Sequence, residues 1–148
     1  MINKIELHDI TRDNWLECAS IECTDEQKVY FPIPVIGWMA RAKYEDDVKE
    51  KAIYVDNNLV GFCVYGIEPE TDYPWIISII IDKKYQNKGY GKAGIMLLIS
   101  LLKSISSHKE IYICHRFENK HAEHVYKSIG FIETIKTIDN EKILVYIY

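Results

Sequence analysis

The sequence predicts a mixed α/β domain that spans residues 1–148 and is built around a single sheet. Two observations support this. Runs of β-branched and aromatic residues alternate with helical patterns, and turn-forming residues separate most of these segments. Together the segments amount to about seven strands and about four helices. A chain of 148 residues is long enough for one domain with a substantial core.

The first half of the chain places two helical segments between strands. We expect a strand over residues 3–10 and a helix from Thr11 onward, because threonine is a favourable N-cap. Residues 30–47 contain two prolines and then apolar residues at helical spacing, which predicts a loop and a short helix. Residues 51–68 predict a β-hairpin, because two apolar arms flank the turn sequence DNN.

The second half begins with a strand at 74–82 that is apolar on both faces, which indicates a central position in the sheet. A helix is expected from Gly89 to about Ser104, and its apolar residues lie nearly all round it, which predicts burial. The remaining predicted elements are a strand at 110–114, a helix at 119–129 that ends at Gly130, and a hairpin of strands at 131–138 and 142–148.

Composition and charge restrict the class of protein. Hydrophobic residues make up 48% of the chain and charged residues 27%, as in ordinary globular proteins. The net charge of -4 argues against a general nucleic-acid binder, which would be basic. The longest apolar run, residues 94–102, is too short to span a bilayer, and the first ten residues lack the apolar centre of a signal peptide. We expect a cytoplasmic protein with no nucleic-acid partner and no membrane partner.

Cysteine and histidine spacing does not predict a metal site. No two cysteines have C-x-x-C spacing, so reduced, mostly buried thiols are expected at Cys18, Cys23, Cys63 and Cys114. His121 and His124 lie near Glu118 on one predicted helix. Two histidines without a clear third ligand are more typical of a solvated helix face, so we expect no metal.

The turn before the helix at Gly89 has the features of an anion site. Gly89 and Gly91 lie between Lys88 and Lys92. The first N–H groups of a helix have no intrahelical partner and carry the positive end of the helix dipole. Glycine lets an anion approach this backbone closely. The spacing matches neither a P-loop nor a dinucleotide-binding motif, and a turn that needs glycine only for its geometry is an equally good interpretation.

Two motifs occur in order in this half of the chain. Residues 86–91 read QNKGYG and fit the pattern [QR]-x-x-G-x-[GA], between a predicted strand and a predicted helix. Residues 119–131 contain N-x-x-A-x-x-x-Y-x-x-x-G-F. Together they resemble the GNAT superfamily of acyl-CoA-dependent N-acetyltransferases. The resemblance extends to the element order of the whole chain and implies a mostly antiparallel sheet with a splayed parallel pair of strands at the cofactor site.

Three further segments are similar to the bacterial spermine/spermidine acetyltransferase group. They are residues 31–45, 52–66 and 81–92. This finer resemblance is more diffuse, and it points to a polyamine as the acceptor.

The resemblance implies acetyl-CoA as the acyl donor and assigns two stretches of backbone to it. The pyrophosphate is expected on the turn and helix start formed by Gln86, Asn87, Lys88, Gly89, Tyr90, Gly91 and Lys92. The pantetheine arm is expected along Ile79, Ile80 and Ile81, where a strand N–H can also polarise the thioester carbonyl.

Tyr126 is the expected catalytic residue. A thiol has a pKa of about 8.5, so a well-placed phenol can protonate the departing CoA sulfur. Asn119 lies about two helical turns earlier and shares a face with Tyr126, so its amide is expected to hold the pantetheine arm or a water. Without the motif, Tyr126 would be an ordinary core-edge tyrosine, one of 11 in the chain.

The general base is not apparent in the sequence. A primary amine with a pKa of about 10.4 needs a base, a water chain or a cationic environment near neutral pH. In related polyamine enzymes a carboxylate often lies on the strand that corresponds to 74–82, whereas here residues 76–81 offer only Ser78. Carboxylates that could attract a polycation elsewhere are Glu22, Asp25, Glu26, Glu68, Glu70 and Asp72, although each alone is typical of a solvated surface.

We therefore expect an N-acetyltransferase that moves an acetyl group directly from acetyl-CoA to a primary amine, with spermine or spermidine as the leading acceptor. An amino acid, an antibiotic or a protein amine remains open as the acceptor, and so does a non-catalytic acyl-CoA-binding module. Trp38 and Trp75 belong either to the core or to a substrate slot. A homodimer through the final strand, 142–148, is compatible with its aromatic and β-branched residues.

Overall fold

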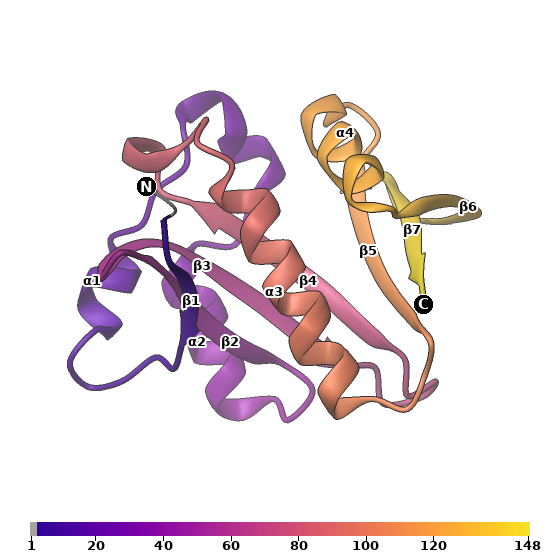
Figure 1. The fold of residues 1–148 in the computed structure, drawn as a ribbon, viewed down its shortest axis with the longest axis horizontal. Coiled ribbons are helices and arrows are strands. Elements are labelled where there is room, and N and C mark those ends of the chain that lie inside the picture. Colours follow the sequence, from indigo (N-terminus) through magenta and orange to yellow (C-terminus); the bar gives the residue numbers. More distant parts are fainter. Residues whose placement is uncertain (1–2) are drawn as a thin grey trace.

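A computed structural model describes residues 3–148 as one seven-stranded sheet with helices on both faces (Figure 1). The elements in chain order are β1 (Ile5–His8), α1 (Trp15–Ala19), the 3-10 helix η1 (Asp25–Tyr30), α2 (Val35–Tyr44), β2 (Lys49–Val55), β3 (Asn58–Ile67), β4 (Pro74–Ile81), the 3-10 helix η2 (Lys83–Tyr85), α3 (Tyr90–Ile105), β5 (Glu110–Arg116), α4 (Lys120–Ile129), β6 (Ile132–Ile138) and β7 (Glu141–Ile147).

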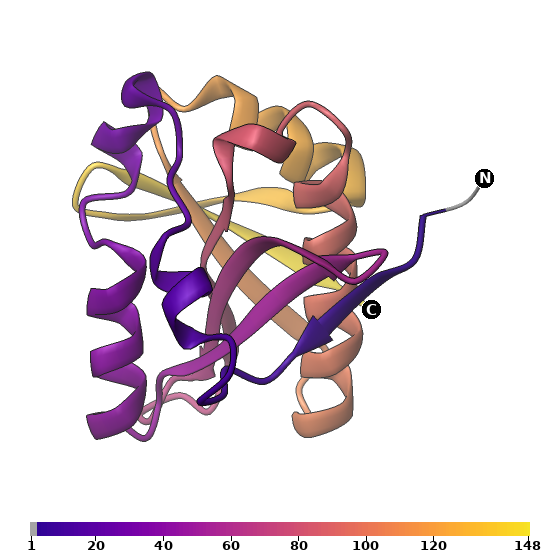
Figure 2. The ribbon, with the colours of Figure 1, turned by 90° about the vertical axis from the view of Figure 1, so that its left-hand side faces the viewer.

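The sheet separates two hydrophobic clusters. One contains Ile95, Leu98 and Leu102 of α3 and is flanked by residues of α4, and the other contains Cys18 of α1 and Val35 of α2. Figure 2 shows α2 and α3 on opposite sides of the strands. Burial of apolar side chains on both faces explains why the central strands are apolar throughout.

The strand order is β1-β2-β3-β4-β5-β7-β6, and every neighbouring pair is antiparallel except β4 and β5. The parallel pair is short. Its register contains only Trp75 opposite Tyr112 and Ile76 opposite Ile113, after which the two strands part. The predicted mixed α/β fold, with a mostly antiparallel sheet and a splayed parallel pair, is confirmed.

Local sequence features account for most element ends. Asp56 and Asn57 have φ values of 49° and 70°, the left-handed conformations of the predicted hairpin turn. Helix α4 begins after Asn119, whose side-chain oxygen accepts the Ala122 N–H at 3.2 Å, and it ends at Gly130 with φ 123°.

Two predictions about helices are wrong. Helix α1 begins at Trp15 rather than at Thr11, because the Thr11 hydroxyl accepts the Asp13 N–H and the Thr11 N–H donates to the Asn14 side chain, which forms a turn ahead of the helix. Helix α3 is not buried all round. The sheet covers only one of its faces, so Met96 on the other side is 53% exposed.

The final strand is not an edge of the sheet. Strand β7 pairs with β5 on one side and with β6 on the other, so the edge is β6, where Ile132 and Ile135 are exposed.

The 3-10 helix η1 was not predicted from the sequence. Among residues 3–148, no helix has both the length and the apolar character needed to cross a bilayer.

Candidate active site

The turn before α3 exposes backbone donors. Asn87 and Gly89 have φ values of 63° and 82°, and a Cβ built on Gly89 would meet no heavy atom within 4 Å. The first bond at the start of α3 runs from the Ala93 N–H to the Gly89 carbonyl at 3.1 Å. The N–H groups of Tyr90, Gly91 and Lys92 precede this bond, so they have no carbonyl partner within the helix and are available to an anion.

Gln86 anchors this turn to its surroundings. Its side-chain nitrogen donates to the Ile81 carbonyl at 2.8 Å and to the Gln27 side chain at 2.8 Å. The turn is therefore fixed to the end of β4 and to η1.

Two lysines add positive charge at the same turn. Lys88 and Lys92 are exposed, and within the described chain neither pairs with a carboxylate, whereas Lys83 pairs with Glu22 at 3.1 Å. Because their charges are not neutralised by the protein, Lys88 and Lys92 favour phosphate groups at the turn.

The edge of β4 faces the gap between the parted strands. Ile79, Ile80 and Ile81 pair with β3 only, opposite Cys63, Phe62 and Gly61, so their other backbone edge has no strand partner among the described residues. Ile79 and Ile81 pack into the cluster beneath α3, and Ile80 packs into the cluster beneath α2. The side chains therefore hold the strand, while the backbone groups on the edge away from β3 remain available for hydrogen bonds, apart from the Ile81 carbonyl that accepts from Gln86.

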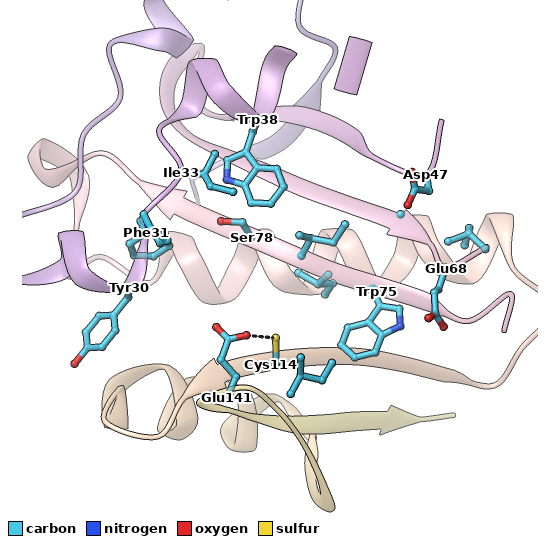
Figure 3. Close-up of a pocket in the computed structure, with 16 residues that line it drawn as sticks. Tyr30, Phe31, Ile33, Trp38, Asp47, Glu68, Trp75, Ser78, Cys114 and Glu141 are labelled. Carbon is cyan, nitrogen blue, oxygen red and sulfur yellow. Dashed lines mark hydrogen bonds between the residues drawn. The ribbon is translucent and has the colours of Figure 1, made fainter. Parts of the chain in front are cut away.

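A cavity of about 420 Å³ begins where β4 and β5 part, on the face of the sheet that carries α2 (Figure 3). Aromatic side chains form much of its wall, and carboxylates from three separate segments line it. Its lining residues are Tyr30, Phe31, Pro32, Ile33, Trp38, Asp47, Gly66, Ile67, Glu68, Trp75, Ile76, Ile77, Ser78, Cys114, Ile138 and Glu141. The volume falls in the range of small-molecule sites. Trp38 and Trp75 thus line a slot.

The carboxylates lie in two places in the cavity. Figure 3 shows Asp47 and Glu68 on one side and Glu141 on the other, with Trp75 between. Asp47 can lie here because Gly66 has no side chain: a Cβ on Gly66 would be 1.9 Å from the Asp47 carbonyl oxygen.

Of the six carboxylates singled out in the sequence, only Glu68 lines this cavity. Asp25, one of the other five, instead forms an exposed ion pair with Lys28 at 2.8 Å. No pattern in the sequence pointed to Asp47 or Glu141. Asp47 reaches the cavity because β2, which follows it, pairs with β3, and Glu141 reaches it because β7 pairs with β5.

Tyr126 lies on α4, partly buried, with its ring centroid 6.1 Å from those of His115 and Phe131. Burial raises the pKa of Tyr126 well above its usual value, and the nearby acidic groups of Cys114 and Glu141 raise it further. The phenol is therefore protonated at neutral pH, as a general acid must be. Asn119 uses its side-chain oxygen to cap α4, so only its amide nitrogen is left for a ligand.

Cys114 and Glu141 are joined across β5 and β7. The Cys114 Sγ donates to the Glu141 carboxylate at 3.1 Å. Burial, followed by this hydrogen bond and the charge of Glu141, raises the pKa of Cys114 to about 12. The thiol therefore stays protonated and is a poor nucleophile.

The four cysteines are free, and Cys18, Cys23 and Cys63 are buried as expected. Among residues 3–148, no three histidine, cysteine, aspartate or glutamate side chains are grouped closely enough to hold a metal ion. His121 and His124 are exposed on α4.

The family model described as acetyltransferase (GNAT) family matches residues 5–131. The chain belongs to the acetyltransferase (GNAT) family. Membership confirms the expected enzyme class, an acyl-CoA-dependent N-acetyltransferase with acetyl-CoA as the acyl donor.

Two curated relatives of this GNAT protein come from Bacillus subtilis. A probable spermine N(1)-acetyltransferase of subsp. natto (strain BEST195) is 31% identical over 133 residues, which cover 86% of this chain and 87% of the relative. A spermine/spermidine N(1)-acetyltransferase of strain 168 is 30% identical over 133 residues with the same coverage.

Solved structures share the GNAT fold with this chain at lower identity. A domain from Methanocaldococcus jannaschii DSM 2661 has a TM-score of 0.79 at 21% identity. The match covers 99% of this chain and 100% of the chain of that domain. A spermidine N-acetyltransferase from Vibrio cholerae, in complex with CoA and spermine, has a TM-score of 0.77 at 18% identity. The match covers 97% of this chain and 95% of the Vibrio cholerae chain.

Proposed function

We propose that this GNAT enzyme acetylates a primary amine of a linear polyamine such as spermine or spermidine. The observation that supports this proposal most strongly is the cavity at the split strands, which combines Asp47, Glu68 and Glu141 with aromatic walls. A polyamine carries several ammonium groups on a flexible apolar chain. Carboxylates can pair with the charges, and aromatic rings can cover the methylene groups and attract the cations. The names of the two Bacillus subtilis relatives support the same acceptor class.

The donor side of the site is formed by the turn before α3 and by β4. The turn fits the phosphates of acetyl-CoA, because it has free N–H groups, open space at Gly89 and two cations, Lys88 and Lys92, that pair with no carboxylate of residues 3–148. Gln86 and Asn87 shape this turn, and the backbone of Ile79, Ile80 and Ile81 would bind the pantetheine amides. This arrangement directs the acyl end toward the point where β4 and β5 part.

Tyr126 would act at that point as the general acid. Its phenol would donate a proton to the sulfur of the departing CoA. Cys114 is not expected to carry the acetyl group, because its thiol stays protonated and donates to Glu141. We therefore propose direct transfer to the amine, with Asn119 holding the pantetheine arm or a water through its amide nitrogen.

The test is the release of free CoA thiol from acetyl-CoA across a panel of amines: spermine, spermidine, putrescine, butylamine, amino acids, aminoglycosides and a lysine peptide. We expect rapid release with spermine or spermidine, slow release with butylamine, and a product heavier by one acetyl group. Rapid release with an amino acid or an aminoglycoside, and none with polyamines, would replace the proposed acceptor while leaving the enzyme class intact.

Replacing Gly89 with alanine tests the donor site. An L-residue at φ 82° is strained by about 1–2 kcal/mol, and its methyl group would project into the space assigned to phosphate. We expect the KM for acetyl-CoA to rise about tenfold or more, with kcat at saturation nearly unchanged. Steady-state kinetics would measure both quantities. Ser100→Ala, on the exposed face of the same helix, is the control, and an unchanged KM for Gly89→Ala would contradict the assignment.

A further inference from the structure

We propose that Glu141 accepts the proton of the reacting ammonium group and that Cys114 positions the Glu141 carboxylate for this step. The inference rests on the proposed acetyl transfer to an amine and names the base that the reaction requires. Strand β4 does not supply this base. Among its residues that line the cavity, only Ser78 and the indole of Trp75 are polar, and neither is a carboxylate.

Glu141 lies where the cavity meets the split in the sheet. The last paired residue of β5 in the parallel register is Ile113, and the next residue, Cys114, lines the cavity. Glu141 begins β7, the neighbour of β5 on the other side, and its carboxylate lies 3.1 Å from the Cys114 sulfur. An amine beside Glu141 would therefore lie next to the gap toward which the turn and β4 direct the acyl group.

The other two carboxylates of the cavity are suited to a different role. Figure 3 shows Asp47 and Glu68 together on the far side of Trp75 from Glu141. A linear diamine could place one ammonium group at each carboxylate position, with its methylene chain along the indole. This arrangement separates the carboxylate that takes the proton, Glu141, from those that hold the distal charge.

The groups around Glu141 leave its carboxylate available to an incoming cation. Cys114 and Arg116 are on β5, Tyr126 is on α4, and Tyr30 lies in the opposite wall of the cavity. Arg116, the register partner of Glu141, is directed to Glu118 at 3.6 Å. Within residues 3–148, no lysine, arginine or histidine forms an ion pair with Glu141, and its one side-chain partner is the neutral thiol of Cys114.

The hydrogen bond from Cys114 fixes the orientation of the base. It is donated to Oε2 of Glu141, so the same carboxylate keeps Oε1 for the amine. Cys114 is a positioning residue in this scheme, because it acts on Glu141 and not on the reacting atoms.

The proposed step balances as follows. Glu141 takes one proton from R–NH₃⁺ and releases it to solvent, and the amine nitrogen attacks the thioester carbon to form a C–N bond. The C–S bond then breaks, and the CoA thiolate takes the proton of Tyr126. The second proton lost by the nitrogen returns to the Tyr126 phenolate, so the products are the N-acetyl amine, CoA thiol and one proton.

The substitution Glu141→Gln keeps the shape of the side chain and removes the base. With spermidine at saturation, we expect kcat near pH 7 to fall about 100-fold, within the range for general base catalysis. The residual rate should rise about tenfold per pH unit toward the amine pKa of about 10.4, because only free amine then reacts. The wild-type rate should reach its plateau at a lower pH than the rate of the Glu141→Gln variant. A raised KM with unchanged kcat and an unchanged pH profile would show that Glu141 only attracts the cation, which would overturn the proposal.

Three further variants separate this role from a structural one. Glu133→Gln removes a carboxylate from the same hairpin, where Glu133 pairs with Lys142 at 2.8 Å, and it should leave the pH profile unchanged. Cys114→Ala should lower kcat, and Cys114→Ser, which restores a donor, should recover most of it. Failure of the serine variant to recover kcat would remove the positioning role.

The wild-type assay distinguishes this inference from the proposed function. If wild-type protein acetylates no amine, the proposed function fails, and the assignment of Glu141 as the base fails with it. If wild-type protein acetylates spermidine and Glu141→Gln does so equally fast with the same pH profile, only the base assignment fails.

Discussion

Replacing Tyr126 with phenylalanine is expected to lower kcat for acetyl transfer by about 100- to 1,000-fold, within the range for loss of a general acid. The substitution removes one hydroxyl and keeps the ring that packs near Phe131. Because burial and the neighbouring acidic groups keep the phenol protonated, the wild-type side chain holds a proton that it could donate to the CoA sulfur in the proposed reaction. Steady-state kinetics with spermidine and saturating acetyl-CoA would measure the loss.

Binding of acetyl-CoA should be nearly unchanged in this variant, because the assigned donor contacts are at the turn and at β4. Calorimetric titration with CoA would test this independently of turnover. The hydroxyl of Tyr148 is a suitable control: it donates to the His108 carbonyl at 2.6 Å, and Tyr148→Phe should retain kcat. A Tyr126→Phe enzyme with wild-type kcat would exclude Tyr126 as the acid and direct attention to a water or to the buried His115 beside it.

Replacing Glu68 with glutamine is expected to raise the KM for spermidine about tenfold and to leave the weaker KM for butylamine unchanged. A hydrogen bond between charged groups contributes about 1.5–3 kcal/mol, and Glu68 is partly exposed, so the low end of that range applies. Only an acceptor with a second ammonium group can make this contact at the far side of the cavity. Kinetics with both amines would measure the two KM values.

Glu70 provides the matched control for Glu68. It lies in the same connection after β3, is exposed and does not line the cavity. Glu70→Gln should therefore leave both KM values unchanged. Equal increases in KM for spermidine and butylamine in Glu68→Gln would show that Glu68 does not bind the distal ammonium group. The acceptor would then have to be bound in another way.

The sequence determined the features that depend on neighbouring residues. Hairpin turns followed from residues that tolerate left-handed backbone, such as Asp56 and Asn57, and the end of α4 followed from Gly130. The two motifs placed the turn at Gly89 and the helix of Tyr126 correctly, because each is a short segment whose conformation is set by its own residues. The start of α1 was predicted too early because the competing turn depends on side-chain hydrogen bonds of Thr11 and Asn14.

The proposed acceptor side of the site depends mostly on tertiary structure. In the sequence, Glu141 is only a residue that follows a hairpin turn. In the structure, β7 lies between β5 and β6, and this brings Glu141 to Cys114. Asp47 reaches the cavity because Gly66 leaves room for its backbone. Register between distant strands depends on the summed burial of both faces of the sheet, which no short segment encodes by itself. The sequence could therefore indicate the proposed donor turn, the proposed acid and Glu68, but not Asp47 or Glu141.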